Sequence, residues 1–406
     1  MVLSEQSRTN FIALLSAANA TDDVSAGFAM ALAGGEPLLA HQISALRNQG
    51  ITRFLIEVDS VSGALLTLAD KFKSNGCSVD FVRSASDLQS FLRLNESLLV
   101  QSEALYLSTD LLDNLLAESG SFIATLDGRD ENAAFERMDL NTRWAGLAII
   151  GASTVSSLGA LPEGWSITSS LLRQAMQDRV RLAPLPQQHV QTGRLRLIST
   201  ANDADQLSQQ ILLGRGRRHN GFIETKIFGP LAARLAPYIW RSPPGPNLVD
   251  ISTVAFGSAS LGLAVIGWNI SAISTAILAI FLNILRSTTR DTARNVGLSK
   301  FVEPIIWGVL GIGAIAAAHG DYSYSSDGIF AAITMTGLAL LAQQLNLPQW
   351  GRYILKSPAL LALALLAATP VAGFALAAQW ISITQLAALI LAKWAQKLRS
   401  KKAGQA

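Results

Sequence analysis

The sequence predicts an α/β domain in its first half and an all-α bundle of six membrane-spanning helices in its second half. Half of the 406 residues are hydrophobic, 15% are charged, and the mean hydropathy of +0.33 is too high for an ordinary soluble protein. Apolar runs long enough to cross a bilayer recur after Asn247. The first 247 residues carry a net charge of −3 and the rest carry +6, so the two halves are expected to face different solvents.

Residues 1–200 alternate short apolar runs with helical patterns. The apolar runs lie at residues 11–17, 53–58, 104–108, 122–126 and 144–150. Helical patterns near residues 37–49, 61–75 and 85–95 separate the first three of them. Strands that alternate with helices in this way form a mostly parallel sheet covered by helices, so we expect an α/β domain here, on the cytosolic side of the membrane.

Residues 201–246 connect the two predicted domains. A basic run at residues 212–221 is followed by an apolar helical stripe that ends at Trp240, and Pro243, Pro244 and Pro246 then break the chain. Basic residues beside an apolar stripe suit a helix that lies in the membrane surface, where anionic headgroups attract it. A plain linker helix is the alternative.

Residues 247–399 form the predicted membrane domain. A bilayer core of about 30 Å requires about 20 mostly apolar residues per helix. The six predicted spans cover residues 248–267, 270–286, 302–318, 328–345, 358–376 and 379–396.

All eleven Lys and Arg residues after Asn247 fall in connections on one side of this bundle. They are Arg286, Arg290, Arg294, Lys300, Arg352, Lys356, Lys393, Lys397, Arg399, Lys401 and Lys402. Because Lys and Arg near helix ends stay on the cytoplasmic side, these connections are predicted to be cytoplasmic. We expect the protein to lie in the inner (cytoplasmic) membrane. Both termini, including the basic tail at residues 400–406, are then cytoplasmic.

Composition also excludes several classes of protein. A single cysteine, Cys77, excludes an internal disulfide and a Cys-rich zinc site, and four scattered histidines form no metal-ligand cluster. The basic residues lie beside apolar spans and are not massed on one face, so we expect no nucleic acid partner.

Residues 32–51, L-A-G-G-E-P-L-L-A-H-Q-I-S-A-L-R-N-Q-G-I, resemble the start of the nucleotidyltransferase family, which includes inositol-phosphate cytidylyltransferases. The resemblance implies a Rossmann-like α/β fold. Family members grip the triphosphate with basic residues just before this segment, whereas no Lys or Arg occurs here between Arg8 and Arg47. Without these charge-assisted partners, catalysis on a triphosphate is not expected.

Two groups of charged residues in this domain are candidates for a site. Thr109-Asp110 resembles the Gly-Asp pair whose carboxylate holds Mg²⁺ in the family, but a cap of the helix that begins at Leu111 is the preferred interpretation of Asp110. In the segment F-E-R-M-D at residues 135–139, Glu136, Arg137 and Asp139 could line a pocket. A solvated strand and turn explain these charges equally well.

The junction and the six spans resemble the CDP-alcohol phosphotransferase family, in particular members that fuse a cytosolic nucleotidyltransferase domain to the bundle and make inositol-phosphate phosphodiesters. The family motif is D-x2-D-G-x2-A-R-x8-G-x3-D-x3-D, and only Ala293-Arg294 matches it. The four metal-binding aspartates of the motif correspond here to Arg286, Thr289, Trp307 and Gly311.

A rebuilt metal site would need Asp250, Asp291 and Glu303 to converge, and the last two are the candidate catalytic residues. Replacing two acids by a cation and a hydroxyl changes the local charge by about +3, which disfavours a divalent cation. The same change favours a pocket that binds a phosphate or a headgroup directly. Its candidate residues are Arg286, Arg290, Arg294, Lys300 and Asn247. Alternatively, the four cations only anchor a cytoplasmic loop.

The sequence therefore leaves two functions open. The protein is either a CDP-alcohol phosphotransferase of phospholipid or phosphodiester synthesis, or a non-catalytic relative that binds a phosphorylated headgroup or nucleotide or supports a partner enzyme. We expect no cofactor, and Mg²⁺ or Mn²⁺ only if transfer is retained. The expected partners are membrane lipids, a CDP-alcohol or other nucleotide, and a second copy of the chain or a lipid-synthesis enzyme.

Overall fold

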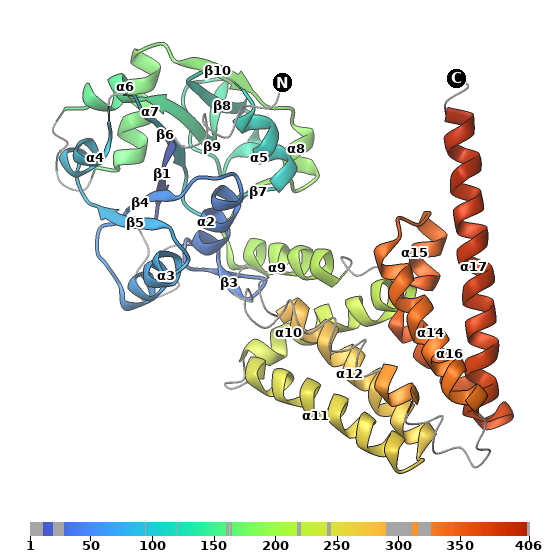
Figure 1. The fold of residues 1–406 in the computed structure, drawn as a ribbon. Helices are drawn as coiled ribbons and strands as arrows, with labels where there is room; N and C mark the ends of the chain where they lie inside the picture. Colours follow the sequence, from blue (N-terminus) through green and yellow to red (C-terminus); the bar gives the residue numbers. More distant parts are fainter. Residues whose placement is uncertain are drawn as a thin grey trace. The chain divides into compact units, whose positions relative to one another are not determined.

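A computed structural model describes residues 11–18, 28–93, 95–118, 120–159, 162, 165–216, 221–241, 245–289, 311–315 and 326–403 (Figure 1). The chain divides into two compact units, Met1–Ser208 and Gln209–Ala406. The first is an α/β unit and the second is entirely helical among its described residues.

The α/β unit is built on a seven-stranded sheet with the strand order β10-β8-β9-β6-β1-β4-β5. Every neighbouring pair is parallel except the two that involve β9, which runs antiparallel to β6 and β8. The mostly parallel sheet that the sequence predicts is therefore confirmed. The strands are β1 (Phe11–Ser16), β4 (Arg53–Glu57), β5 (Ser78–Val82), β6 (Ser97–Gln101), β8 (Phe122–Asp127), β9 (Thr142–Gly151) and β10 (Arg181–Pro184).

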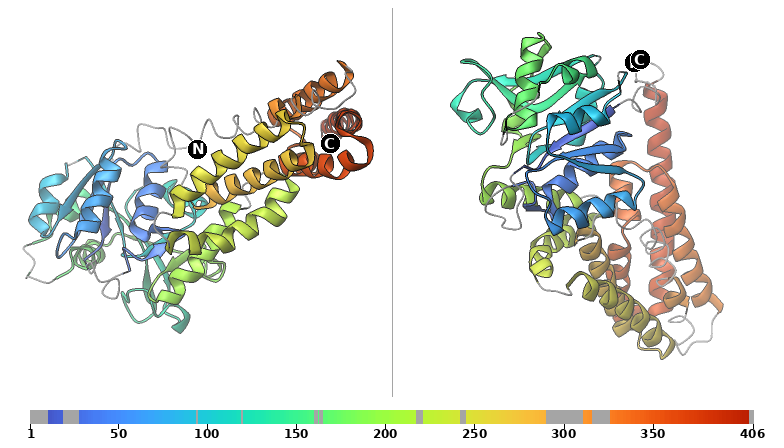
Figure 2. Two further views of the ribbon diagram at one scale, coloured as in Figure 1. Left: turned by 90° about the horizontal axis from the view of Figure 1, so that it is seen from below. Right: turned by 90° about the vertical axis from the view of Figure 1, so that its left-hand side faces the viewer.

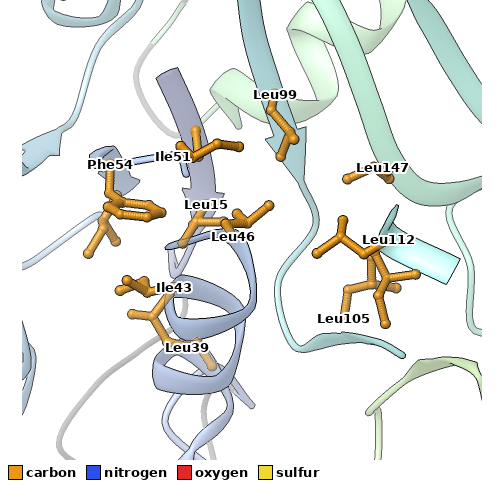
Figure 3. Close-up of a cluster of buried hydrophobic side chains, with 14 of the residues drawn as sticks. Leu15, Leu39, Ile43, Leu46, Ile51, Phe54, Leu99, Leu105, Leu112 and Leu147 are labelled. Carbon is orange, nitrogen blue, oxygen red and sulfur yellow. The ribbon is translucent and has the colours of Figure 1, made fainter. Parts of the chain in front are cut away.

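Helices cover both faces of this sheet (Figures 1 and 2). Side chains alternate along a strand, so Ala13 and Leu15 of β1 enter the core beneath α2, α3 and α5, whereas Ile12 and Leu14 enter the core beneath α4, α6 and α7. Figure 3 shows part of the first core. The helices are α2 (Leu38–Asn48), α3 (Gly63–Lys73), α4 (Ala85–Phe91), α5 (Thr109–Leu116), α6 (Ala152–Ser156), α7 (Ile167–Gln177) and α8 (Gln188–Gln191), with a 3-10 turn at Asp130–Asn132.

Two short hairpins lie outside the main sheet. One pairs β2 (Leu32–Ala33) with β3 (Glu36–Pro37), and the other pairs β7 (Leu105–Leu107) with β11 (Leu195–Leu197). The predicted strand at residues 104–108 is therefore not part of the parallel sheet. The central strand beside β1 is β6, which the sequence did not separate from the apolar run that follows it.

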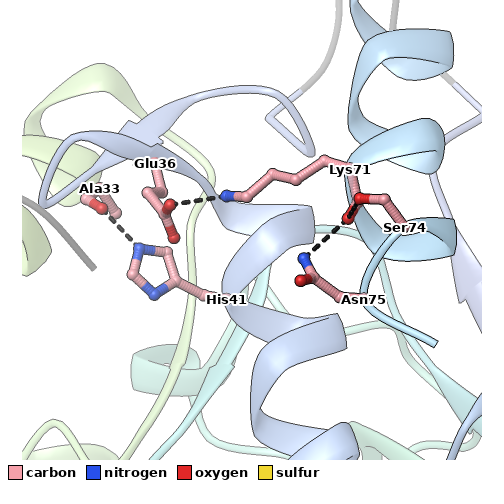
Figure 4. A network of polar contacts seen from close by, with 6 residues as sticks. All are labelled: Ala33, Glu36, His41, Lys71, Ser74 and Asn75. Carbon is pink, nitrogen blue, oxygen red and sulfur yellow. Dashed lines mark hydrogen bonds and ion pairs between the residues drawn. The ribbon is translucent and has the colours of Figure 1, made fainter. Parts of the chain in front are cut away.

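The segment that carries the nucleotidyltransferase resemblance forms the β2–β3 hairpin and α2. Gly34 and Gly35 hold the hairpin turn with φ of 60° and 87°, which favours glycine. Lys71 Nζ donates to Glu36 Oε1 at 2.8 Å, and a ring nitrogen of His41 lies 2.6 Å from the carbonyl oxygen of Ala33 (Figure 4). These contacts tie the hairpin to α2 and α3.

The helical unit contains α10 (Gly229–Arg241), α11 (Gly245–Val265), α12 (Asn269–Thr289), α14 (Ser326–Gln344), α15 (Gln349–Leu355), α16 (Pro358–Ala372) and α17 (Phe374–Ala403). A π-helical turn at Glu224–Phe228 leads into α10, and α9 (Ala201–Gly216) crosses from one unit to the other. Within this unit, Ala232 of α10 packs in the same core as Ile280 and Ile284 of α12. Contact of the junction with a membrane surface stays a prediction.

Three described helices are long and apolar enough to cross a membrane, which is consistent with a membrane protein. Their apolar windows are Leu248–Val265, Asn269–Thr289 and Phe374–Lys397. A bent pair, α15 and α16 at 54°, makes a fourth if it counts as one span, and Gly328–Gln344 is a shorter apolar helix. The predicted span at residues 302–318 lies mostly outside the described residues, so six spans and their orientation stay predictions.

The ends of the last two predicted spans differ from the structure. Residues 358–376 were expected to form one helix, but α16 ends at Ala372 and α17 begins at Phe374. Gly373 lies between them with φ of 77°, a conformation that ends a right-handed helix. Hydropathy does not reveal this break because apolar residues continue across it.

Candidate functional site

Two of the predicted phosphate-binding residues are described: Arg286 lies in the last turn of α12 and Asn247 in the first turn of α11. Arg286 donates from Nε to Oδ1 of Asp250 at 3.0 Å, and Arg286 is only 8% exposed. Thr289, at the second motif position, is buried and donates to the carbonyl oxygen of Arg286 at 3.0 Å. The structure thus pairs one predicted phosphate-binding cation with one predicted metal-binding acid.

This ion pair argues against the hypothesis that Asp250 binds a metal ion. A guanidinium 3.0 Å from Asp250 neutralises the carboxylate and repels a divalent cation that would replace it. No group of three or more His, Cys, Asp or Glu side chains that could hold a metal occurs among the described residues. Asn247 lies in the first turn of α11, while Arg290, Asp291, Arg294, Lys300 and Glu303 lie outside the described residues.

The structure adds a cation that the sequence did not single out. Nη1 of Arg215, in the last turn of α9, lies 3.5 Å from the carbonyl oxygen of Thr288. The carboxyl end of a helix carries a partial negative charge, which attracts cations such as Arg215 and Arg286. Seventy-three residues separate Arg215 from Thr288, so no local sequence pattern predicts this contact.

A second candidate site is a pocket of about 260 Å³ in the α/β unit. It lies at the carboxyl ends of β1 and β6, where open α/β sheets bind their ligands. Its lining comprises Ser16, Ser102, Glu103, Ala134, Phe135, Glu136, Trp144, Gly146, Ser166, Thr168, Ser169 and Leu197. Apart from the indole of Trp144, its polar side chains all carry hydroxyl or carboxylate groups.

The acid at the end of the central strand is Glu103 and not Asp110. Oε1 of Glu103 accepts a hydrogen bond from the backbone N–H of Ala29 at 3.3 Å. Asp110 follows β7, outside the main sheet, lies in the first turn of α5 and forms an ion pair with Arg194. Its side chain is 62% exposed and does not line the pocket, and its role as a Mg²⁺ ligand stays a prediction.

The charged segment at residues 135–139 divides between the pocket and a turn. Glu136 lines the pocket and accepts a hydrogen bond from the hydroxyl of Ser169 at 3.2 Å. Arg137 instead donates to the carbonyl oxygen of Asp139 at 3.0 Å. The N–H of Asn141 donates to the Asp139 carboxylate at 2.7 Å and, as the main cause, lowers the pKa of that carboxyl. Of the three charged residues Glu136, Arg137 and Asp139, only Glu136 lines the pocket.

An internal carboxylate occupies the amino-terminal end of α7. Glu57, at the end of β4 and 4% exposed, accepts hydrogen bonds from the N–H of Ile167 at 2.6 Å and the N–H of Thr168 at 3.3 Å. The hydroxyls of Ser166 and Thr168 also donate to it. A helix amino terminus attracts anions, and here Glu57 already fills that role.

Two residues that line the pocket each carry a buried polar atom that lacks a partner. Nε1 of Trp144, which is 2% exposed, and Oγ of Ser102 are buried without a hydrogen bond among the described residues. Gly146 also lines the pocket, with φ of 87°. A Cβ at Gly146 would lie 2.6 Å from Oγ of Ser102 and 2.9 Å from Cδ1 of Leu105, so the close packing here requires glycine.

Comparison with known proteins gives structural likenesses only. No protein-family model and no curated protein matches the chain. Solved structures that are similar include the inositol-1-phosphate CTP transferase from T. maritima, with 12% identity and a TM-score of 0.34, over 44% of this chain and 85% of that one.

Two more are the CTP:phosphocholine cytidylyltransferase from Streptococcus pneumoniae and a Bacillus anthracis protein provisionally assigned as a glucose-1-phosphate thymidylyltransferase. The former has 13% identity and a TM-score of 0.35, over 50% of this chain and 99% of that one. The latter has 11% identity and a TM-score of 0.34, and the likeness covers 48% of this chain and 99% of that one. The topology of its own seven-stranded sheet defines the fold of the α/β unit.

Proposed function

We propose that this protein is a membrane protein that binds the phosphate of a lipid headgroup or a nucleotide at one end of its helical bundle and does not transfer it. In this proposal the bundle is of the CDP-alcohol phosphotransferase type, with the metal-binding acids replaced by cations. The ion pair between Arg286 and Asp250 carries the proposal, because it occupies the one described acid of the candidate metal site.

The charge at this end of the bundle supports binding of an anion. Arg286 forms an ion pair with Asp250, and Arg215, whose Nη1 lies 3.5 Å from the carbonyl oxygen of Thr288, places a second guanidinium beside the last turn of α12. A guanidinium has five N–H donors, so a single bond from Nε to Asp250 does not exhaust the donors of Arg286. Arginine binds phosphate through two parallel hydrogen bonds, which a metal-free site requires.

The binding test uses the full chain in nanodiscs of phosphatidylcholine. Cytidine diphosphate tests the nucleotide source of the phosphate, and phosphatidic acid mixed into the nanodisc tests the headgroup source. We expect one of the two to raise the temperature of thermal unfolding. Loss of a charge-assisted hydrogen bond costs about 1.5–3 kcal/mol, so Arg215→Gln should weaken the apparent affinity about tenfold or more.

Arg352→Gln is the matched control, because Arg352 is an exposed arginine of α15 on the same predicted side of the membrane. The affinity of the Arg352→Gln variant for the phosphate probe should equal that of the wild type. A Mg²⁺-dependent transfer from a CDP-alcohol that disappears in Asp291→Ala or Glu303→Ala overturns the proposal in favour of a transferase. Equal affinities for all three proteins also overturn it.

A further inference from the structure

We propose that Glu224 is a positioning residue for the phosphate site of the helical unit. This inference rests on the proposed function, in which Arg215 binds the phosphate beside the last turn of α12. Glu224 lies in the π-helical turn that leads into α10. Its buried carboxylate fixes the segment of chain that presents Arg215 to the site.

The carboxylate of Glu224 is buried against the amino-terminal end of α16. Glu224 is 3% exposed, and its Oε1 accepts a hydrogen bond from the N–H of Ala359 at 2.8 Å. Its Oε2 accepts one from the hydroxyl of Ser357 at 2.5 Å, at the point where the chain bends by 54° between α15 and α16. A Cβ at Gly221 would overlap Oε2 of Glu224 and lie 2.7 Å from Cβ of Ser357, so the two segments are in close contact.

Capping of α16 does not by itself explain this carboxylate. Oγ of Ser357 already accepts from the N–H of Leu360 at 3.1 Å, which is the usual N-cap bond. Glu224 forms no ion pair among the described residues, so only neutral donors and the partial positive charge of the helix end hold its charge. Burial of a charge without an ionic partner is costly. What Glu224 adds is a connection between two segments that lie 133 residues apart.

The chain itself leads from this connection to Arg215. Arg215 lies in the last turn of α9, and only residues 217–220 separate the end of α9 from Gly221. The turn that carries Glu224 is therefore the first described anchor that follows Arg215 along the chain. If this turn leaves α16, the end of α9 loses its nearest fixed point.

Packing within the helical unit provides a second route. Leu212 of α9 shares a buried cluster with Ala233 and Ala236 of α10, and α10 begins directly after the π-helical turn. The position of the turn thus sets the position of α10, against which the last part of α9 packs. Both routes end at the contact of Nη1 of Arg215 with the carbonyl oxygen of Thr288.

The test is a double-mutant cycle of Glu224 with Arg215, measured on the full chain in nanodiscs of phosphatidylcholine. The probes are cytidine diphosphate and phosphatidic acid. Glu224→Gln keeps the shape of the side chain and removes its charge. We expect it to weaken the apparent affinity for the probe that binds by about three- to tenfold, at most the effect of Arg215→Gln. In a protein that already carries Arg215→Gln, the further loss should be less than about twofold, because Glu224 acts through Arg215.

Ser357→Ala is a second variant in case Glu224→Gln lowers the stability of the fold, and it should weaken the affinity in the same way. Gln343→Leu is the matched control, with the affinity of the wild type. Gln343 donates to the carbonyl oxygen of Lys356 at 3.3 Å, at the α15 end of the same bend.

The inference is overturned if Arg215→Gln weakens binding while the folded Glu224→Gln and Ser357→Ala variants bind as the wild type does. It is also overturned if Glu224→Gln causes the same loss with and without Arg215, since Glu224 then acts on the fold in general. If neither probe binds, or if Arg215→Gln has no effect, the proposed function fails and this inference fails with it.

Discussion

Glu57→Gln tests whether a buried carboxylate holds α7 against the sheet. Glu57 accepts four hydrogen bonds, two from backbone N–H groups of the first turn of α7 and two from hydroxyls of Ser166 and Thr168. Glutamine has the same shape but loses the charge, and its amide N–H₂ must face groups that are themselves donors. A hydrogen bond to a charged group is worth about 1.5–3 kcal/mol.

We therefore expect Glu57→Gln to destabilise α7 by about 2–3 kcal/mol, since some hydrogen bonds to the amide oxygen survive. The measurement is native-state hydrogen exchange of the α7 amides in the full chain, which reports local opening in a protein of two units. Glu118→Gln is the control. Glu118 forms an exposed ion pair with Arg181 at 2.5 Å, and such pairs are worth about 0–1 kcal/mol. The reasoning fails if α7 opens equally easily in both variants.

Two further predictions concern a glycine and a helix cap. Gly146→Ala should destabilise the α/β unit by about 1–3 kcal/mol more than Gly120→Ala, because both have strained φ but only Gly146 would place a Cβ on Ser102. If urea unfolding shows the same loss of stability for both variants, the predicted clash between a Cβ at position 146 and Ser102 is refuted. Burial raises the pKa of the Asp203 carboxyl, but hydrogen bonds, chiefly from Thr200, outweigh burial and lower it overall. Its stabilisation of α9 should be complete above pH about 4 and lost below it in circular dichroism, whereas Asp203→Asn should flatten this dependence.

Local patterns in the sequence predict much of the α/β fold. Strands β1 and β4 and helices α2 and α3 fall within two residues of their predicted bounds, since each is a bounded apolar run or an amphipathic stretch. Strand β6 was missed because two short apolar runs follow each other at residues 97–107. Only pairing with β1 and β9, far away in sequence, decides which run is central. That choice also decides that the acid following the central strand is Glu103, whereas Asp110 follows β7.

The candidate site of the helical unit was predictable in its residues but not in its contacts. The motif alignment singled out Arg286, and the first span singled out Asp250, yet nothing local says that these two side chains pair across 36 residues. In the sequence, Arg215 belongs to a basic run that is expected to lie in the membrane surface. Its position beside the last turn of α12 follows from helix packing alone.

Burial decides how much each ion pair opposes metal binding. Asp110 is exposed and Arg194 is half-buried, so their pair is worth about 1 kcal/mol and a metal could displace it at little cost. Arg286 is buried, and removing its partner leaves an uncompensated charge that costs about 3–5 kcal/mol. A divalent cation at Asp250 therefore meets a penalty of at least two powers of ten in affinity before it forms any bond of its own. That penalty, more than the absence of the motif aspartates, favours a cation-lined site that holds a phosphate over one that holds a metal.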